Sequence, residues 1–266
     1  PFTINFSRDD VRITTHYHAD MVASSLFSVI HEGGHALYEL HTGRELARSN
    51  LGTGVSMGIH ESQSRFYENI IGRSRAFCSI IYPWLKEHFA PRLDHVTEDD
   101  FYRMINKSEP SLIRTEADEL TYCLHIMVRY ELEKRMFDGS LTAHDLPAEW
   151  NRLYKEYLGI DVPDDRQGVL QDSHWANGNI GYFPSYAIGS AYGAQYLLEM
   201  SKELDVDAVV RSGDLTPINN WLEDRIWKHG CMKDPVALFE SVCGKFDPAC
   251  YVAYLEKKFT EVYGLS

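Results

Sequence analysis

The stretch FSVIHEGGHALYEL, residues 27–40, places two histidines four positions apart in the pattern HExxH, residues 31–35. Positions i and i+4 of a helix lie one above the other on the same face, so the imidazoles of His31 and His35 can reach one cation. The carboxylate of Glu32 lies beside them, where it can accept a proton from a water molecule on that cation. The stretch therefore predicts a helix that carries a metal site with an adjacent general base.

Two consecutive glycines, Gly33 and Gly34, lie inside this pattern. A glycine in a helix interior costs about 1 kcal/mol relative to alanine, so the pair contradicts the helical preference of its surroundings. Local violations of this kind tend to mark functional sites. Either the helix face leaves room for a substrate or another backbone, or the glycines allow tight helix packing. Because HExxH also occurs by chance, a third ligand is needed to support the metal site.

The best candidate for the third ligand is Glu61, which follows a glycine-rich stretch, LGTGVSMG at residues 51–58. The glycines of this stretch predict a loop. A new helix is predicted over 60–76, and Glu61 lies near its start, 26 residues beyond His35. That separation allows the first helix to end and a second helix to run back past the metal. A ligand set of His31, His35 and Glu61 is typical of a zinc metallopeptidase. Alternatively, Glu61 is a first-turn carboxylate that complements the helix dipole.

Length and composition limit the remaining possibilities. With 266 residues the chain can form one large domain or two small ones, and its 44% hydrophobic and 24% charged residues are ordinary for a globular protein. The net charge of −13, from 26 basic and 39 acidic residues, argues against nucleic acid or an anionic membrane as a partner. The sequence has no apolar run of membrane-spanning length and no signal-like start. Five scattered cysteines without a CxxC pair fit a reducing, cytoplasmic location: Cys78, Cys123, Cys231, Cys243 and Cys250.

Apolar residues at three- and four-residue spacing predict a mainly helical chain. A short strand is predicted at Val11–His18, which is β-branched and roughly alternating. A strand beside the metal helix would offer its edge to a peptide. The expected helical stretches are Met21–Leu40, Phe66–Phe89, Leu112–Phe137, Trp150–Tyr157, Ala187–Leu204, Pro217–Trp227, Pro235–Phe246 and Pro248–Tyr263.

Two charged blocks permit both a functional and a structural interpretation. DVRIT, residues 10–14, puts Asp10, Arg12 and a hydroxyl on the predicted strand, where the two charges can also form an ordinary surface ion pair. IRTEADE, residues 113–119, opens a predicted long helix. There Arg114 can serve a site, or it can form a routine i,i+4 pair with Asp118.

Two loops concentrate polar and aromatic side chains. GVLQDSHW, residues 168–175, contains Gln171, Asp172 and His174, a composition that suits a site better than a core. GYFPSY, residues 181–186, leads into a predicted helix. Tyr186 in this segment can donate a hydrogen bond, although aromatic side chains in such loops commonly serve packing.

Taken together, these blocks resemble the motifs of the M32 metallocarboxypeptidases, the thermostable carboxypeptidase Taq-like group. The resemblance is specific because five blocks occur in the family's order across residues 1–175. The blocks are DxRxT at 10–14, HExxH at 31–35, HESQ at 60–63, an IxxxAD-type block at 113–118 and GxxQDxHW at 168–175.

The resemblance implies a mainly α-helical, zincin-like metallopeptidase domain with a small β-sheet beside the active-site helix and a long groove. It implies one divalent metal ion at His31, His35 and Glu61, with zinc expected first and cobalt or manganese as alternatives that accept the same donors. It further implies removal of single residues from peptides with a free C-terminus, with broad side-chain tolerance, commonly by a homodimer.

The matching blocks also imply roles for individual side chains. Glu32 would be the general base, and Arg114 would bind the free carboxylate of the substrate, which a planar guanidinium matches in shape. His174 and Tyr186 would stabilise the tetrahedral oxyanion or hold the peptide. The further substrate-binding residues expected from these blocks are Arg12, Gln171 and Asp172.

The family carries an HPF block upstream of these motifs, and this chain opens with Pro1-Phe2. We therefore expect residues 1–266 to form a single catalytic domain that is the C-terminal part of a longer member, with the missing N-terminal portion of the same protein as a partner. Two rival functions remain. Another HExxH peptidase, an aminopeptidase or endopeptidase, would bind the opposite end or the middle of a peptide, and a catalytically silent helical scaffold would not turn over peptides at all.

Overall fold

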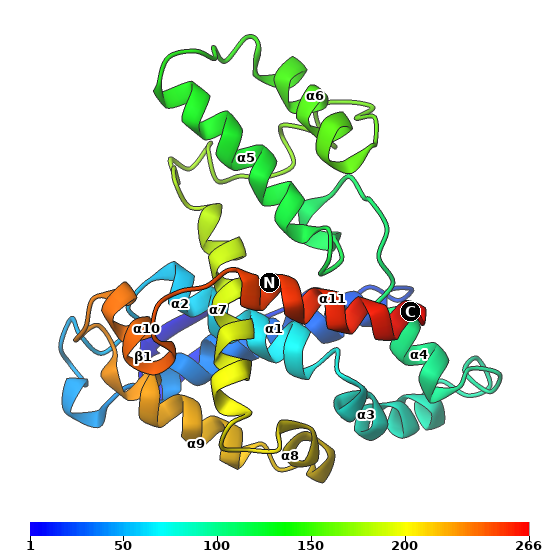
Figure 1. Cartoon of the computed structure of the whole chain (residues 1–266), viewed down its shortest axis with the longest axis vertical. Helices are drawn as coiled ribbons and strands as arrows, with labels where there is room; N and C mark the ends of the chain where they lie inside the picture. The colour runs from blue at the N-terminus through cyan, green and yellow to red at the C-terminus, as the bar shows by residue number, and fades with distance from the viewer. Residues whose placement is uncertain (266) are drawn as a thin grey trace. The chain divides into compact units, whose positions relative to one another are not determined.

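The structure is a computed structural model that describes residues 1–265 (Figure 1). The chain divides into two compact units. The main unit consists of residues 1–106 together with the residues from 188 onward, and the inserted unit consists of residues 107–187, the mostly green part of Figure 1. Each unit is described by itself. The single catalytic domain expected from the sequence stays a prediction.

The described residues are mainly helical with one two-stranded sheet, as predicted. The strands are β1 (Phe2–Ser7) and β2 (Asp10–Thr14). The helices are α1 (Val22–Leu40), α2 (Met57–Arg65), α3 (Arg75–His88), α4 (Glu98–Ile105), α5 (Tyr122–Phe137), α6 (Leu146–Leu158), α7 (Pro184–Met200), α8 (Val206–Ser212), α9 (Thr216–Arg225), α10 (Pro235–Cys243) and α11 (Ala249–Tyr263). None of the helices in residues 1–265 is both long and apolar enough to cross a lipid bilayer.

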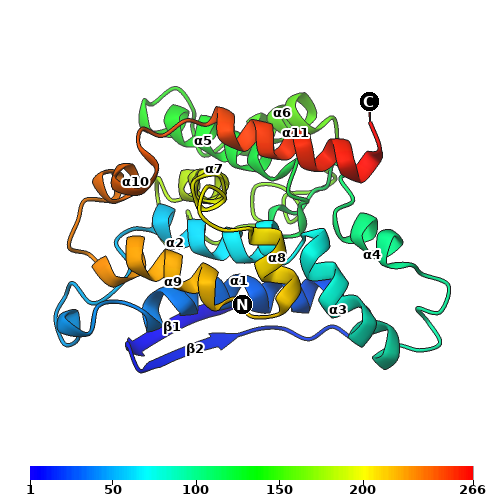
Figure 2. The same ribbon diagram turned by 60° about the horizontal axis from the view of Figure 1, so that its bottom comes forward.

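The sheet lies along α1, the helix of the HExxH pattern (Figure 2). β1 and β2 pair antiparallel, with Thr3 opposite Ile13 and Asn5 opposite Val11. Because side chains alternate between the two faces of a strand, one face carries Thr3 and Asn5, which hydrogen-bond to side chains of α1. The other face carries Phe2, Ile4 and Phe6, which are exposed.

Helix α2 lies between α1 and α7, and a glycine on each of those helices permits the close approach. A Cβ on Gly34 of α1 would lie 2.7 Å from the backbone of Gln63 and Ser64, and one on Gly189 of α7 would overlap Glu61. The tight-packing interpretation of the HExxH glycines is therefore correct for Gly34. Nothing lies within 4 Å of a Cβ built on Gly33, so the helix surface is open at that position.

The inserted unit has a core of its own between α5 and α6. Val128 and Leu132 of α5 pack against Trp150 and Tyr154 of α6, and all four side chains are buried. A long segment after α6, residues 159–183, packs against this core and carries the GxxQDxHW block.

Several element boundaries predicted from the sequence are wrong. The predicted helix Leu112–Phe137 begins only at Tyr122, because Asp118 accepts hydrogen bonds from the N–H groups of Leu120 and Thr121 and holds the preceding segment in turns. The predicted strand Val11–His18 ends at Thr14.

The stretch Phe66–Phe89 is broken, since a π-helical turn over Phe66–Ile71 precedes α3 and the Ser74 hydroxyl caps α3. β1, α4 and α8 were not predicted from the sequence. All five cysteines are free thiols, in agreement with the absence of a CxxC pair.

Candidate metal centre and guanidinium cluster

The three predicted metal ligands lie together in the main unit. Nε2 of His31 is 3.7 Å from Oε2 of Glu61, and Nε2 of His35 is 3.8 Å from Oε1 of the same carboxylate. One donor atom from each residue lies within 4.8 Å of the others. Donors around a tetrahedral zinc ion lie about 3.3 Å apart, so these three side chains, which we call the metal cluster, would move closer together around a divalent metal.

The Nδ1 atom of His31 points away from Glu61 and lies 2.8 Å from Oε2 of Glu68. Glu68 lies in the π-helical turn and also pairs with Arg65 and Arg73. A carboxylate on the outer nitrogen of a ligand histidine fixes the ring orientation and directs the other nitrogen to the metal. Burial alone would lower the pKa of His31, but the hydrogen bond that its Nδ1 donates to Glu68 and the charge of Glu61 raise it.

The second predicted ligand, His35, is held through another histidine. Nδ1 of His35 lies 3.1 Å from Nδ1 of His60, whose Nε2 lies 2.6 Å from Oε1 of Glu39. A carboxylate accepts, so His60 carries its proton on Nε2, its Nδ1 accepts from His35, and Nε2 of His35 is left with a lone pair. Burial lowers the pKa of His35 well below its usual range, and the electrostatic influence of the neighbouring His31 and His60 rings lowers it further. Both effects favour a neutral imidazole, the form that binds a metal.

Glu61 comes from the first turns of α2, one residue from His60, and only 2% of its surface is exposed. The Ser56 hydroxyl caps this helix by accepting from the N–H of Ile59, so α2 begins three residues earlier than predicted. The helix-dipole alternative for Glu61 does not account for its position, because the carboxylate faces both histidines of α1.

The predicted general base, Glu32, is also buried and lies on the side of α1 that meets the sheet. Its Oε2 accepts a hydrogen bond of 2.6 Å from the hydroxyl of Thr3 on β1. The small strand thus contacts the carboxylate next to the ligand histidines, as expected for a sheet beside the metal helix.

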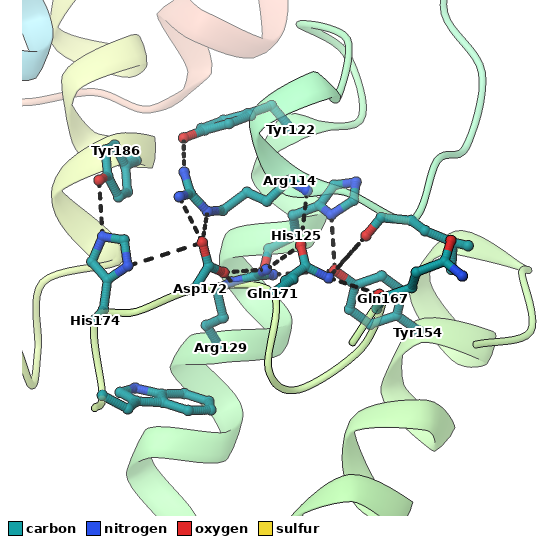
Figure 3. Close-up of polar contacts among 12 residues, drawn as sticks. Arg114, Tyr122, His125, Arg129, Tyr154, Gln167, Gln171, Asp172, His174 and Tyr186 are labelled. Atoms are coloured by element: carbon teal, nitrogen blue, oxygen red, sulfur yellow. Dashed lines mark hydrogen bonds and ion pairs between the residues drawn. The ribbon is translucent and has the colours of Figure 1, made fainter. Parts of the chain in front are cut away.

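Most of the other predicted site residues meet in the inserted unit (Figure 3). Asp172 lies between two arginines: Oδ1 accepts from Nε and Nη2 of Arg114 at 3.0 and 2.8 Å, and Oδ2 accepts from Nε of Arg129 at 2.7 Å. Arg129 is fully buried and Arg114 is 5% exposed. One carboxylate shared by two buried guanidinium groups leaves an excess positive charge, and we call these three residues the guanidinium cluster. Although burial alone would raise it, the pKa of Asp172 is lowered by Arg129 and Arg114.

Gln171 holds the backbone of this cluster in place. Its Oε1 accepts from the N–H of Arg114 and from Nη2 of Arg129, both at 2.9 Å. Its Nε2 donates to the carbonyl of Leu112 at 3.0 Å. The structural alternative for Arg114, an i,i+4 pair with Asp118, is wrong, because Arg114 lies in a single 3-10 turn rather than in an α-helix and bonds to Asp172.

His174 and Tyr186, the predicted oxyanion or peptide-holding residues, bond to each other, with His174 Nε2 lying 3.0 Å from the tyrosine hydroxyl. The Arg114 guanidinium lies 4.7 Å from the centre of the Tyr186 ring, so the same tyrosine also borders the guanidinium cluster. The loop that carries His174 is held in place by Glu133 of α5, whose carboxylate accepts hydrogen bonds from Nε1 of Trp175 and from the N–H of Gly181.

Arg12 lies apart from these groups, on the outer face of the sheet. It forms a bidentate pair with Asp10 at 2.7 and 2.8 Å, and its guanidinium lies 4.9 Å from the Phe6 ring. Both charged side chains are exposed. This geometry is the surface ion pair considered as the structural alternative, and a substrate-binding role for Arg12 stays a prediction.

Several residues of both clusters were not identified from the sequence. A signal was present for two of them, since Glu39 lies four positions after His35 on α1 and Glu68 lies seven positions after Glu61. No comparable signal exists for Arg129, because its partner Asp172 is 43 positions away. Thr3 and Glu133 were also missed.

Comparison with known proteins identifies the family. The carboxypeptidase Taq (M32) metallopeptidase model matches residues 1–259. The chain belongs to this family. It is 44% identical over 265 residues to carboxypeptidase 1 of Bacillus subtilis, covering 99% of this chain and 53% of that protein. It is 42% identical over 261 residues to thermostable carboxypeptidase 1 of Pyrococcus furiosus, covering 97% and 52%.

Solved structures agree with this assignment. The M32 carboxypeptidase of Deinococcus radiodurans superimposes with a TM-score of 0.96 at 40% identity, over 99% of this chain and 54% of that one. The M32 resemblance and the mainly helical fold predicted from the sequence are thereby confirmed. The chain spans about half the length of the relatives that it matches.

Proposed function

We propose that these residues form the catalytic part of a metal-dependent carboxypeptidase that removes the C-terminal residue of peptides. The observation that carries the proposal is the convergence of His31, His35 and Glu61, with donor atoms within 4.8 Å of one another. Membership of a metallopeptidase family supports it. The remaining steps follow from the chemistry of the side chains.

The donor set fits a divalent metal. Two imidazoles that turn Nε2 toward one buried carboxylate form a typical catalytic zinc site, and we propose zinc as the physiological ion, with cobalt and manganese as alternatives. Bound there, the ion would act as a Lewis acid on the peptide carbonyl and lower the pKa of a water molecule.

Glu32 would perform the proton transfers. Its carboxylate, adjacent in sequence to His31, would take a proton from the attacking water and deliver it to the amine of the leaving residue. His174 and Tyr186 would donate hydrogen bonds to the carbonyl oxygen as negative charge develops on it, or hold the peptide. Their mutual bond of 3.0 Å supports a joint role.

Arg114 would bind the free carboxylate of the substrate. Its guanidinium shares Asp172 with Arg129, so the guanidinium cluster keeps an excess positive charge that a second carboxylate can satisfy. Recognition of the carboxylate rather than of a side chain accounts for the broad specificity that we propose. Asp172 and Gln171 would hold Arg114 in position.

The test assays the full natural chain that contains these residues. One peptide is offered to it as a substrate in two forms, with a free C-terminal carboxylate and with a C-terminal amide. We expect the last residue to be released from the free acid and not from the C-terminal amide. We also expect a chelator to abolish this release. Glu32→Gln should abolish turnover, a drop of about 10²–10⁴-fold for a general base, while metal content stays unchanged.

Each rival predicts a different result. Cleavage of the amidated peptide from its other end or in its middle would indicate an aminopeptidase or endopeptidase. Metal loading without turnover of any peptide would indicate a silent helical scaffold. A Glu32→Gln variant that keeps substantial activity would show that the proposed mechanism is wrong.

A further inference from the structure

Thr3 of β1 makes two contacts with one residue of α1, and neither contact was anticipated from the sequence. Its hydroxyl lies 2.6 Å from Oε2 of Glu32 and 3.1 Å from the backbone carbonyl oxygen of Glu32. A hydroxyl has one proton to donate. The shorter distance and the charge of the carboxylate both indicate that this proton goes to Oε2.

The position of Thr3 is fixed independently of this bond. The ladder pairs Thr3 with Ile13 of β2, and two residues further along β1 the side-chain amide of Asn5 donates to Oε2 of Glu39 at 2.6 Å. Strand β1 is thus attached to α1 at two carboxylates that lie two helical turns apart. The hydroxyl that contacts Glu32 therefore comes from a separate element, whose position is set by the strand pairing rather than by α1.

We propose that Thr3 is a positioning residue for the general base. By holding Oε2, its hydroxyl selects the rotamer of Glu32 and leaves Oε1 as the oxygen that receives the proton of the attacking water and then passes it to the leaving amine. This inference rests on the proposed function, in which Glu32 is the base. Thr3 itself touches neither the substrate nor the ligand histidines in this scheme.

A purely structural role would give Thr3 a different signature. If the hydroxyl only attached β1 to α1, its loss would lower the stability of the protein and leave the turnover of folded, metal-loaded molecules unchanged. Positioning of Glu32 instead affects the chemical step, because the rate of proton transfer depends on the orientation of the base. The two roles are therefore separated by kcat per bound metal.

The experiment uses three substitutions at this position in the full natural chain that contains these residues. Thr3→Val keeps the shape and removes the hydroxyl, and we expect kcat to fall about tenfold or more, as for a hydrogen bond to a charged group, with KM within about twofold. Thr3→Ser keeps the hydroxyl and should restore most of the rate. If Thr3→Val does not fold, Thr3→Ala compared with Thr3→Ser isolates the same hydroxyl.

Ser7→Ala is the matched control, because its hydroxyl lies on the same strand and accepts a hydrogen bond from the N–H of Asp9, outside every motif block. It should leave kcat unchanged. Metal content by elemental analysis should be the same in all variants. Equal kcat for Thr3→Val and the wild type, or equal kcat for the alanine and serine variants, would overturn the positioning role. An active Glu32→Gln variant would instead overturn the proposed function itself, so the two failures are distinguishable.

Discussion

The metal cluster and the guanidinium cluster are built with opposite charge. Around His31 and His35, the carboxylates of Glu61 and Glu39 contact histidine rings rather than permanently charged side chains. In the inserted unit the proportions are reversed, because two buried arginines share the single carboxylate of Asp172. We therefore expect the first arrangement to bind a cation and the second to bind an anion.

This difference also concerns how each cluster is stabilised. The metal cluster directs one carboxylate and two imidazoles toward one point, and the proposed metal would stabilise this arrangement when it binds. The guanidinium cluster depends on Asp172 for its own stability, since Arg129 is fully buried and reaches no solvent. Removal of a carboxylate should therefore abolish a ligand site in one cluster and destabilise the fold in the other.

The largest effect is expected for Glu61→Gln. Loss of one of three ligands should reduce zinc affinity well beyond the roughly 10–100-fold that loss of an outer partner costs. Glu68→Gln is the matched control, since Glu68 touches His31 only at Nδ1 and should cause no more than that smaller loss. Competition with a chelator measures both affinities. Equal losses for the two variants would show that Glu61 is not a ligand.

Asp172→Asn tests the stability of the guanidinium cluster. Two buried guanidinium groups would lose their shared charge partner, and the free energy of unfolding should fall by about 3–5 kcal/mol. Asp161→Asn, which removes an exposed pair with Lys155, should cost less than about 1 kcal/mol. Denaturant unfolding, with hydrogen exchange in α5 as a local probe, compares the two. Similar costs would mean that the cluster carries no buried, uncompensated charge.

The next prediction concerns the pH dependence of stability, which depends on a buried histidine beside the guanidinium cluster. Burial, followed by the charges of Arg129 and Arg114, lowers the pKa of His125 to about 3. Below about pH 6.5, His125 binds a proton in the unfolded chain but not in the folded chain. The contribution of His125 to the free energy of unfolding is therefore complete above that pH. It is lost as the pH falls toward 3, by at most about 1.4 kcal/mol per pH unit.

His125→Asn should make the slope shallower by the contribution of His125, while His144→Asn, at an exposed side chain, should leave the slope unchanged. Unfolding by denaturant at several pH values between 4 and 7 measures the slopes. An unchanged slope in His125→Asn would show that His125 does not titrate differently in the two states.

The two clusters also differ in how far the sequence could predict them. The metal cluster comes from an i,i+4 pair and the first turns of the following helix, so spacing along about 30 residues places its donors. The partners of the guanidinium cluster, Arg114 and Asp172, are 58 positions apart and are joined through turns and a loop. Helical periodicity contains no information about such pairings, and it favoured a helix at Arg114 where the side chain of Asp118 stabilises turns instead.

The smallest effect concerns the neighbouring glycines of the HExxH pattern, for which the sequence left two interpretations open. Gly33→Ala should stabilise α1 by up to about 1 kcal/mol, because alanine favours the helix and its Cβ meets nothing within 4 Å. Gly34→Ala gains the same helical preference, but its Cβ would lie 2.7 Å from Gln63 O and Ser64 Cα and would push α2 away.

Thermal unfolding of the two variants should therefore shift in opposite directions, and only Gly34→Ala should weaken metal binding, since α2 carries Glu61. Because the residues are adjacent and the substitution is identical, helical preference cancels in the comparison. Shifts of the same sign in both variants would mean that propensity rather than the contact between α1 and α2 dominates at this position, and that the spacing of the metal donors does not depend on Gly34.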